Sequence, residues 1–223
     1  QQLYQTASIT INGYEKTDLP DSFFDVAIGN IPFGNFKVAD RRYDKHNFLI
    51  HDYFFGKTLD KVRPGGIVAF VTSKGTLDKE NPAVRKYIAQ RADLLGAIRL
   101  PNNAFKANAG TEVVSDIIFL QKRERPLDIA PDWTQIGQTE DGFTINQYFV
   151  DHPEMVLGKP AMENTQYGRQ DYTVVPIEGK ELADQLHDAI RYLHGTYQDI
   201  QLMELQEESI DSSIIADPNM KNY

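Results

Sequence analysis

The chain has 223 residues, 41% of them hydrophobic, and this length allows one large domain or a medium domain with an appendage. It contains no cysteine, which excludes a disulfide framework, a thiolate metal site and a cysteine nucleophile. The net charge of −9 argues, taken alone, against a general nucleic-acid binder, because phosphate affinity comes largely from Lys and Arg. Two short stretches, 35–45 and 121–125, are locally basic, although such runs are usually just a solvated face.

The first half of the chain predicts alternating strands and helices. A buried strand is expected over residues 24–28, before the chain breaks into GNIPFG. Apolar residues at helical spacing within 46–62 predict a helix that stops at a Pro-Gly-Gly sequence. The apolar run 67–72 is too short for a helix and predicts the next strand. An Asn-Pro pair then opens a helix over 82–91.

Two further strands are expected at 94–100 and 113–120. The loop between them is too short for a crossover helix, which favours an antiparallel connection. These elements together predict an α/β sheet whose final strand is reversed. In open sheets of this class, ligands bind outside the carboxyl ends of the strands, so residues 29–34 lie where such a fold does chemistry.

The composition changes after Arg125, where prolines punctuate short amphipathic pieces. We expect a catalytic domain over residues 1–125 and a loop-rich accessory region over 126–223, whose last 18 or so residues look weakly ordered. One amphipathic helix near 181–200 is predicted from an apolar stripe. The stripe consists of Leu182, Leu186, Ile190, Leu193 and Tyr197.

The short segment GNIPFG suits recognition of a flat, hydrogen-bonding group such as a nucleobase. Asn30 offers an amide oxygen, Pro32 stiffens the turn, and Phe33 offers a π-face. The same residue types dominate ordinary β-turns, so a turn capped by Asn30 and closed by Gly34 is the competing interpretation.

The segment and its flanks resemble the adenine-specific, amino-methylating DNA methyltransferases of the type I modification-subunit kind. The matching stretches follow the family's order and spacing: FLIHDYFFGKTLDKVRPGG (48–66), IVAFVTSKG (67–75), VRKYIAQ (84–90) and IRLPNNAF (98–105). A looser resemblance, over INQYFVDHPEMVLG (145–158), is to the methylase part of large helicase–methylase proteins of bacterial mobile elements. The resemblance implies a Rossmann-like class I methyltransferase sheet and S-adenosylmethionine as cofactor. DNA would be the substrate, and a helicase or specificity subunit or segment a partner.

The resemblance also implies how the motif acts on the exocyclic amine of adenine. Asn30 would accept a hydrogen bond from the amine through its side-chain oxygen, and Ile31 would accept one through its backbone carbonyl. Pro32 would shape the turn, and Phe33 would stack on a base flipped out of the duplex. This mechanism requires no metal, and the histidine spacings do not predict a metal site.

Other candidate substrate residues lie on neighbouring loops. Phe105 would close the other side of the flipped base, and Ser73 and Lys74 could contact DNA phosphate, as could Lys106. A small packing cluster is the alternative role for the aromatic residue, and solvent exposure is the alternative for the polar ones.

The sequence departs from the family in two ways. Ile31 replaces the first proline of the usual pair, which frees one φ angle and adds an N–H while leaving the carbonyl in place. Nothing before residue 23 resembles the family's glycine-rich cofactor loop. We interpret residues 8–15 as the preceding strand, with Tyr14 or Glu15 near the adenosine of the cofactor, or otherwise as a surface strand end.

Three functions therefore stay open. The first is the target-base half of an adenine DNA methyltransferase, with activity that depends on sequence upstream of Gln1. The second is amino-methylation of an RNA base or of protein glutamine. The third is a non-catalytic methylase remnant that docks a partner. The missing signal peptide and long apolar run, with the resemblance, predict a cytoplasmic protein with no membrane partner.

Overall fold

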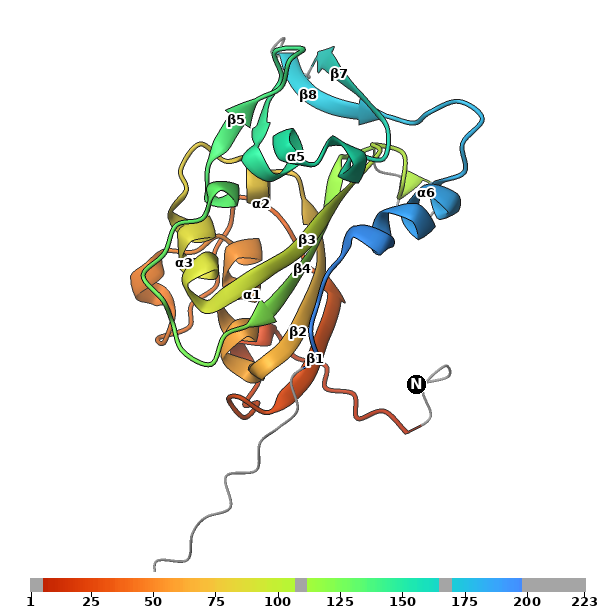
Figure 1. The fold of residues 1–223 in the computed structure, drawn as a ribbon. Helices are drawn as coiled ribbons and strands as arrows, with labels where there is room; N and C mark the ends of the chain where they lie inside the picture. The colour runs from red at the N-terminus through yellow and green to blue at the C-terminus, as the bar shows by residue number, and fades with distance from the viewer. Residues whose placement is uncertain (1–5, 107–111, 165–169, 198–223) are drawn as a thin grey trace, which may run out of the picture.

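The computed structural model describes residues 6–106, 112–164 and 170–197. Its centre is a four-stranded sheet with the order β1-β2-β4-β3 (Figure 1). The strands are β1 (Phe24–Asn30), β2 (Val62–Ser73), β3 (Ala92–Leu100) and β4 (Ser115–Lys122). β1 runs parallel to β2, and β4 runs antiparallel to both of its neighbours. The predicted α/β sheet with a reversed final strand is therefore confirmed.

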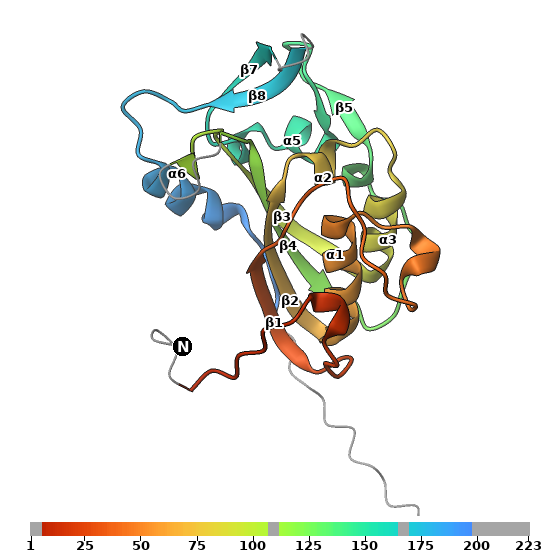
Figure 2. The same ribbon diagram turned by 180° about the vertical axis from the view of Figure 1, so that it is seen from behind.

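Two helices, α1 (Ile50–Lys61) and α3 (Ala83–Arg91), cover one face of this sheet (Figures 1 and 2). α1 begins later than its apolar spacing predicted, because a 3₁₀ turn at Asp44–His46 precedes it and Asn47 takes the left-handed conformation at φ 56°. The short helix α2 (Gly75–Asp78) follows β2 directly. β2 itself runs through the Pro-Gly-Gly sequence, where a Cβ on Gly66 would lie 2.7 Å from the carbonyl oxygen of Asp25.

The expectation that residues 24–28 form a buried strand is correct for the strand and wrong for its burial. β1 is an edge strand of the sheet, and Val26 and Ile28 are 50% and 80% exposed. The cause is the position of β1 in the sheet. Among the described residues β1 has a neighbouring strand on one side only, and α1 packs on the sheet face opposite to the side chains of Val26 and Ile28. A strand that is apolar in sequence therefore presents apolar side chains to solvent.

The region after β4 packs over the carboxyl end of β3 (Figure 1). Its elements are the pairs β5 (Ile136–Gln138) with β6 (Thr144–Asn146) and β7 (Lys159–Asn164) with β8 (Gln170–Val175), the helix α5 (Gln147–Asp151), and 3₁₀ turns at Asp132–Thr134 and Pro153–Met155. Phe149, Met155 and Val174 are fully buried and join the same hydrophobic core as the sheet. We call residues 126–175 the cap.

The amphipathic helix expected near 181–200 is shorter than predicted. α6 spans Leu182–Ala189 and passes into a 3₁₀ turn at Ile190–Tyr192. Residues 193–197 are not helical because they cover the second face of the sheet instead: Leu193 lies against Gly96, and Gln121 donates from its side-chain nitrogen to the carbonyl of Thr196 at 2.7 Å. The expectation of weak order for the last residues lies outside the described part of the chain. Within that part, no helix combines the length and apolarity needed to cross a membrane.

Candidate functional site

The motif GNIPFG lies at the carboxyl end of β1, where hydrogen bonding to β2 holds the backbone in place. Asn30 lies opposite Val71 in the parallel ladder, and the N–H of Ile31 donates to the carbonyl of Val71 at 3.1 Å. The Ile31 side chain is buried in the main core. A proline at this position could not donate, so Ile31 replaces the rigidity of a proline ring with a ladder hydrogen bond and a buried side chain.

The side chains on either side of Ile31 are accessible. Asn30 is exposed, and among the described residues no group forms a hydrogen bond with its amide or with the carbonyl oxygen of Ile31. Pro32 is exposed, and Phe33 is 46% exposed. One amide oxygen, one backbone carbonyl and one aromatic ring are therefore free to meet a ligand at this end of the sheet.

An open groove of about 380 Å³ runs beside the motif, between β1 and α1. Gly29, Asn30 and Ile31 line one side, and Tyr14 and Phe54 line the other. The two rings pack at 4.8 Å between centroids. These aromatic and apolar walls fit a flat, uncharged group such as the adenosine part of a cofactor.

Tyr14 reaches this groove from a 3₁₀ turn (Tyr14–Lys16) and not from a strand. Its hydroxyl lies 3.0 Å from the hydroxyl of Thr58 on α1, and burial raises its pKa. The strand predicted at residues 8–15 is wrong, since residues 8–13 are exposed irregular chain. The carboxylate of Glu15 lies against Gly13, outside the groove.

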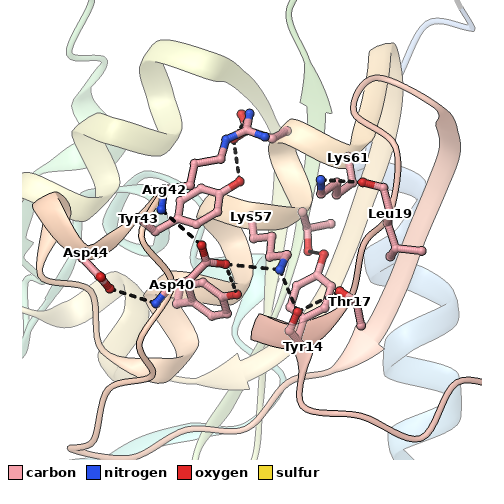
Figure 3. A network of polar contacts seen from close by, with 12 residues as sticks. Tyr14, Thr17, Leu19, Asp40, Arg42, Tyr43, Asp44, Lys57 and Lys61 are labelled. Atoms are coloured by element: carbon pink, nitrogen blue, oxygen red, sulfur yellow. Dashed lines mark hydrogen bonds and ion pairs between the residues drawn. The ribbon is translucent and has the colours of Figure 1, made fainter.

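A polar network fastens the loop after the motif to α1 (Figure 3). Asp40 accepts hydrogen bonds from the hydroxyl of Tyr53 at 2.7 Å and the ammonium of Lys57 at 3.2 Å. Lys57 also donates to the carbonyl of Tyr14 at 2.7 Å. Burial alone would raise the pKa of Asp40, but these donors outweigh burial and lower it. One buried lysine thus ties the groove residue Tyr14 to the loop that follows Phe33.

The same network continues toward the end of α1. The hydroxyl of Tyr43 donates to Asp60 at 2.7 Å, and Arg42 forms ion pairs with Asp60 and Asp21. Lys61 holds the N-terminal segment by donating to the carbonyl of Leu19 and to Asp21, both at 2.6 Å. This network was not predicted, and its only signal in the sequence is the dense mixture of charges in 37–45.

Ser73 and Lys74 lie at the same edge of the sheet as the motif. Asn30 pairs with Val71 near the end of the parallel ladder, and Ser73 ends β2 while Lys74 follows it. Lys74, however, is engaged by the cap: its ammonium lies 2.8 Å from the carboxylate of Asp171 and donates to the carbonyl of Tyr172.

Phe105 lies in the turn that follows β3, at the other edge of the sheet from β1. It is partly buried and packs against the main core at the root of the β3–β4 hairpin. The sheet order separates β3 from β1 by three strand spacings, about 14 Å. A base held between two rings needs about 7 Å. The pairing of Phe33 with Phe105 stays a prediction, and Lys106 pairs with Glu112 at the edge of a loop outside the described residues.

A buried ion cluster at the root of this hairpin was not predicted. Arg99 donates to both oxygens of Asp116 at 2.8 Å and pairs with Asp78 at 2.9 Å. Its guanidinium lies 4.2 Å from the ring centre of Phe149 in the cap. Burial alone would lower the pKa of Arg99, but the two carboxylates outweigh burial and raise it. Arg99 therefore joins β3, β4, α2 and the cap.

A phage protein is similar to this chain in sequence. One relative is "Defense against restriction protein B" of Escherichia phage P1, 32% identical over 165 residues, which are 71% of this chain and 7% of that protein. The chain thus spans a small part of the length of this relative.

Two solved structures resemble the chain at the level of the backbone. One is the type I restriction enzyme EcoKI M protein, with 10% identity, 77% of this chain and 48% of that chain covered, and a TM-score of 0.39. The other is described as a class I S-adenosylmethionine-dependent methyltransferase from Listeria monocytogenes, with 22% identity, 52% and 36% coverage, and a TM-score of 0.39.

The family model "N-6 DNA Methylase" matches residues 4–142, which include the whole central sheet, Tyr14 and the motif after β1. This match extends over more than half of the chain. The chain belongs to the N-6 DNA methylase family, a family of methyltransferases whose cofactor is S-adenosylmethionine.

Proposed function

We propose that this chain carries the target-base side of an adenine-specific DNA methyltransferase. The observation that carries the proposal is the exposed, unbonded amide of Asn30 at the carboxyl end of β1, next to the free carbonyl of Ile31 and the exposed ring of Phe33. Asn30 and Ile31 would accept hydrogen bonds from the two N–H groups of the adenine amine, and Phe33 would stack on the flipped base.

The chemical role of these groups follows from the weakness of the nucleophile. The lone pair of an aryl amine is delocalised into the ring, and two acceptors that converge on its hydrogens draw the nitrogen toward tetrahedral geometry. S-adenosylmethionine supplies an electrophilic methyl group when it is bound. The contribution of the protein is alignment, which is worth about 7 to 11 kcal/mol at best.

We place the adenosine part of the cofactor in the groove between β1 and α1. Tyr14 and Phe54 would pack against the flat ring of the adenosine. Gly29 has no side chain and would let β1 approach the cofactor closely. No glycine-rich cofactor loop precedes β1 in this sequence, so we propose that a further segment of a longer polypeptide supplies it. The free edge of β1 is the place where such a segment would pair.

The test is methyl transfer to adenine in duplex DNA by the full-length polypeptide and its Asn30→Ala variant. We expect Asn30→Ala to lower kcat by about 10²- to 10³-fold, the usual loss when a preorganised polar group is removed from a reacting centre. Asn35→Ala is the matched control, since Asn35 is an exposed amide in the following loop and should leave the rate unchanged.

The alternatives give different results in the same assay. Equal rates for the unaltered protein and Asn30→Ala would contradict the proposal. Activity on RNA or on protein glutamine, with none on DNA, would support an amino-methyltransferase with another substrate. No methyl transfer to any acceptor and no binding of S-adenosylhomocysteine would favour a methylase remnant whose role is to bind a helicase or specificity segment.

A further inference from the structure

The ammonium of Lys74 is held by acceptors that belong to the tip of the cap. It lies 2.8 Å from the carboxylate of Asp171, donates to the carbonyl of Tyr172, and sits 5.7 Å from the centre of the Tyr172 ring. The side chain of Asp171 is 51% exposed, and that of Lys74 is 21% exposed. The carboxylate is therefore the one acceptor that can leave by a simple side-chain rotation.

The backbone beneath this contact is fixed. The N–H of Asn102 donates to the carbonyl of Val174 at 2.8 Å, and its side chain bonds Thr173 at 3.3 Å. Tyr172, on β8 of the cap, is buried, and the guanidinium of Arg99 lies 5.5 Å from the centre of its ring. β8 therefore stays in place beside Lys74, and only the carboxylate of Asp171 is free to exchange for another anion.

The opposite strand gives a second reason to regard this carboxylate as exchangeable. Glu163 on β7 pairs directly with Asp171 across the β7–β8 ladder. Two like charges at directly opposed positions of a sheet destabilise the pairing. Among the described residues, Lys74 is the only cation that forms an ion pair with this pair of acids. The hairpin thus carries excess negative charge within reach of the site where a polyanion would arrive.

We propose that Asp171 occupies the position of a DNA phosphate on Lys74 and that the DNA backbone displaces it when the target strand binds, an inference that rests on the proposed function. Lys74 directly follows the carboxyl end of β2, and the motif that would hold the flipped base leaves the carboxyl end of β1, the parallel neighbour of β2. The phosphodiester group next to that base is the ligand of matching charge and position. Asp171 then lowers the affinity for DNA in the free protein.

The test is equilibrium binding of a labelled DNA duplex by the full-length polypeptide at several salt concentrations. Lys74→Ala should weaken binding and reduce the slope of log K against log salt by about 0.9, because one phosphate contact is lost. Asp171→Asn should tighten binding about two- to fivefold without changing that slope, because it removes a competing surface ion pair. In a Lys74→Ala background, Asp171→Asn should give no such gain.

Glu163→Gln is the matched control. It removes the same charge from the same hairpin, yet Glu163 forms no ion pair with Lys74, so its effect should stay below twofold. Equal gains for Glu163→Gln and Asp171→Asn, or no gain for Asp171→Asn, would overturn the inference while leaving the proposed function intact. Failure of the unaltered protein to bind DNA would overturn both.

A further experiment tests whether Lys74 binds the DNA backbone or free phosphate. Chloride is replaced by inorganic phosphate at constant ionic strength, and DNA affinity should not change. A loss of affinity that is confined to proteins retaining Lys74 would mean that the position binds free phosphate, against the inference.

Discussion

The two edges of the central sheet differ in what covers them. At the β1 edge, Val26 and Ile28 are exposed, a groove stays open, and the following loop is fastened by polar side chains at the flank of α1. At the β3 edge, the cap closes over the strand ends, and the cluster of Arg99 and Asp116 is fully buried. The open edge carries the motif, and the closed edge carries the buried ion cluster.

This difference indicates that the closed edge contributes mainly to stability and that the open edge carries the proposed chemistry. A buried bidentate ion pair with an aromatic ring above it fixes the hairpin root, the turn after β2 and the cap as one unit. The motif needs the opposite, since a base and a cofactor must both reach Asn30. The open edge therefore leaves apolar side chains exposed and, among the described residues, β1 with a neighbouring strand on one side only.

The largest effect on stability is expected at the closed edge. Arg99→Leu leaves the carboxylate of Asp116 buried without its partner and should cost about 3 to 5 kcal/mol of unfolding free energy. For a chain of this size, that corresponds to a fall in Tm of roughly 6 to 20 °C. Thermal unfolding followed by circular dichroism measures it.

The control for this prediction lies on the other side of the molecule. Arg42→Leu removes an arginine that also pairs with two carboxylates, Asp21 and Asp60, but its side chain is 50% exposed. Solvent screening should keep its cost below about 1 kcal/mol. Similar losses for both arginines would mean that the closed edge is no more dependent on buried charge than the open one.

A smaller effect, with a defined pH dependence, is expected in the network behind the motif. Asp40→Asn weakens the bonds from Tyr53 and Lys57 and should cost about 1.5 kcal/mol at pH 7. The folded pKa of Asp40 is lowered, so the unfolded chain takes up this proton first as pH falls. The stabilisation is therefore fully present above about pH 4 and is lost as pH drops through the lowered pKa.

Urea unfolding at pH 7 and near pH 3 checks this expectation. The difference in midpoint between the unaltered protein and Asp40→Asn should shrink at the lower pH, as Asp40 takes up its proton. Asp18→Asn, at an exposed aspartate of the N-terminal segment, should show little difference at either pH. A gap that persists unchanged at low pH would show that Asp40 acts by packing and not by charge.

The succession of strands along the chain and the reversal of the last one could be predicted from the sequence because these depend on local signals. Apolar runs, the Pro-Gly-Gly stop and the short loop after residue 100 each act over a few residues. Which strand lies at the sheet edge is a property of the whole arrangement, so the exposure of Val26 and Ile28 was not predictable. The end of α6 was missed for a related reason: Leu193 fits a helical stripe equally well but packs on Gly96.

In the candidate site, too, only residues with a local sequence signal could be predicted. Asn30 and Phe33 could be found because their motif is contiguous. Arg99 and Asp116 are 17 residues apart, and Lys74 and Asp171 are 97 apart, so no local spacing connects either pair. Tyr14 was a candidate by resemblance, and its place in the groove depends on a contact with Thr58, 44 residues away.

The smallest effect is expected at the open edge itself. Val26→Thr and Ile28→Thr keep a β-branched side chain on an exposed strand, so each should change the unfolding free energy by less than about 0.5 kcal/mol. Val68→Thr, on the neighbouring strand β2, buries a hydroxyl at a position with 0% exposure and should cost about 1 to 3 kcal/mol. If the edge substitutions cost as much as Val68→Thr, β1 is covered in solution by another segment or a second copy, and the open edge belongs to a larger interface.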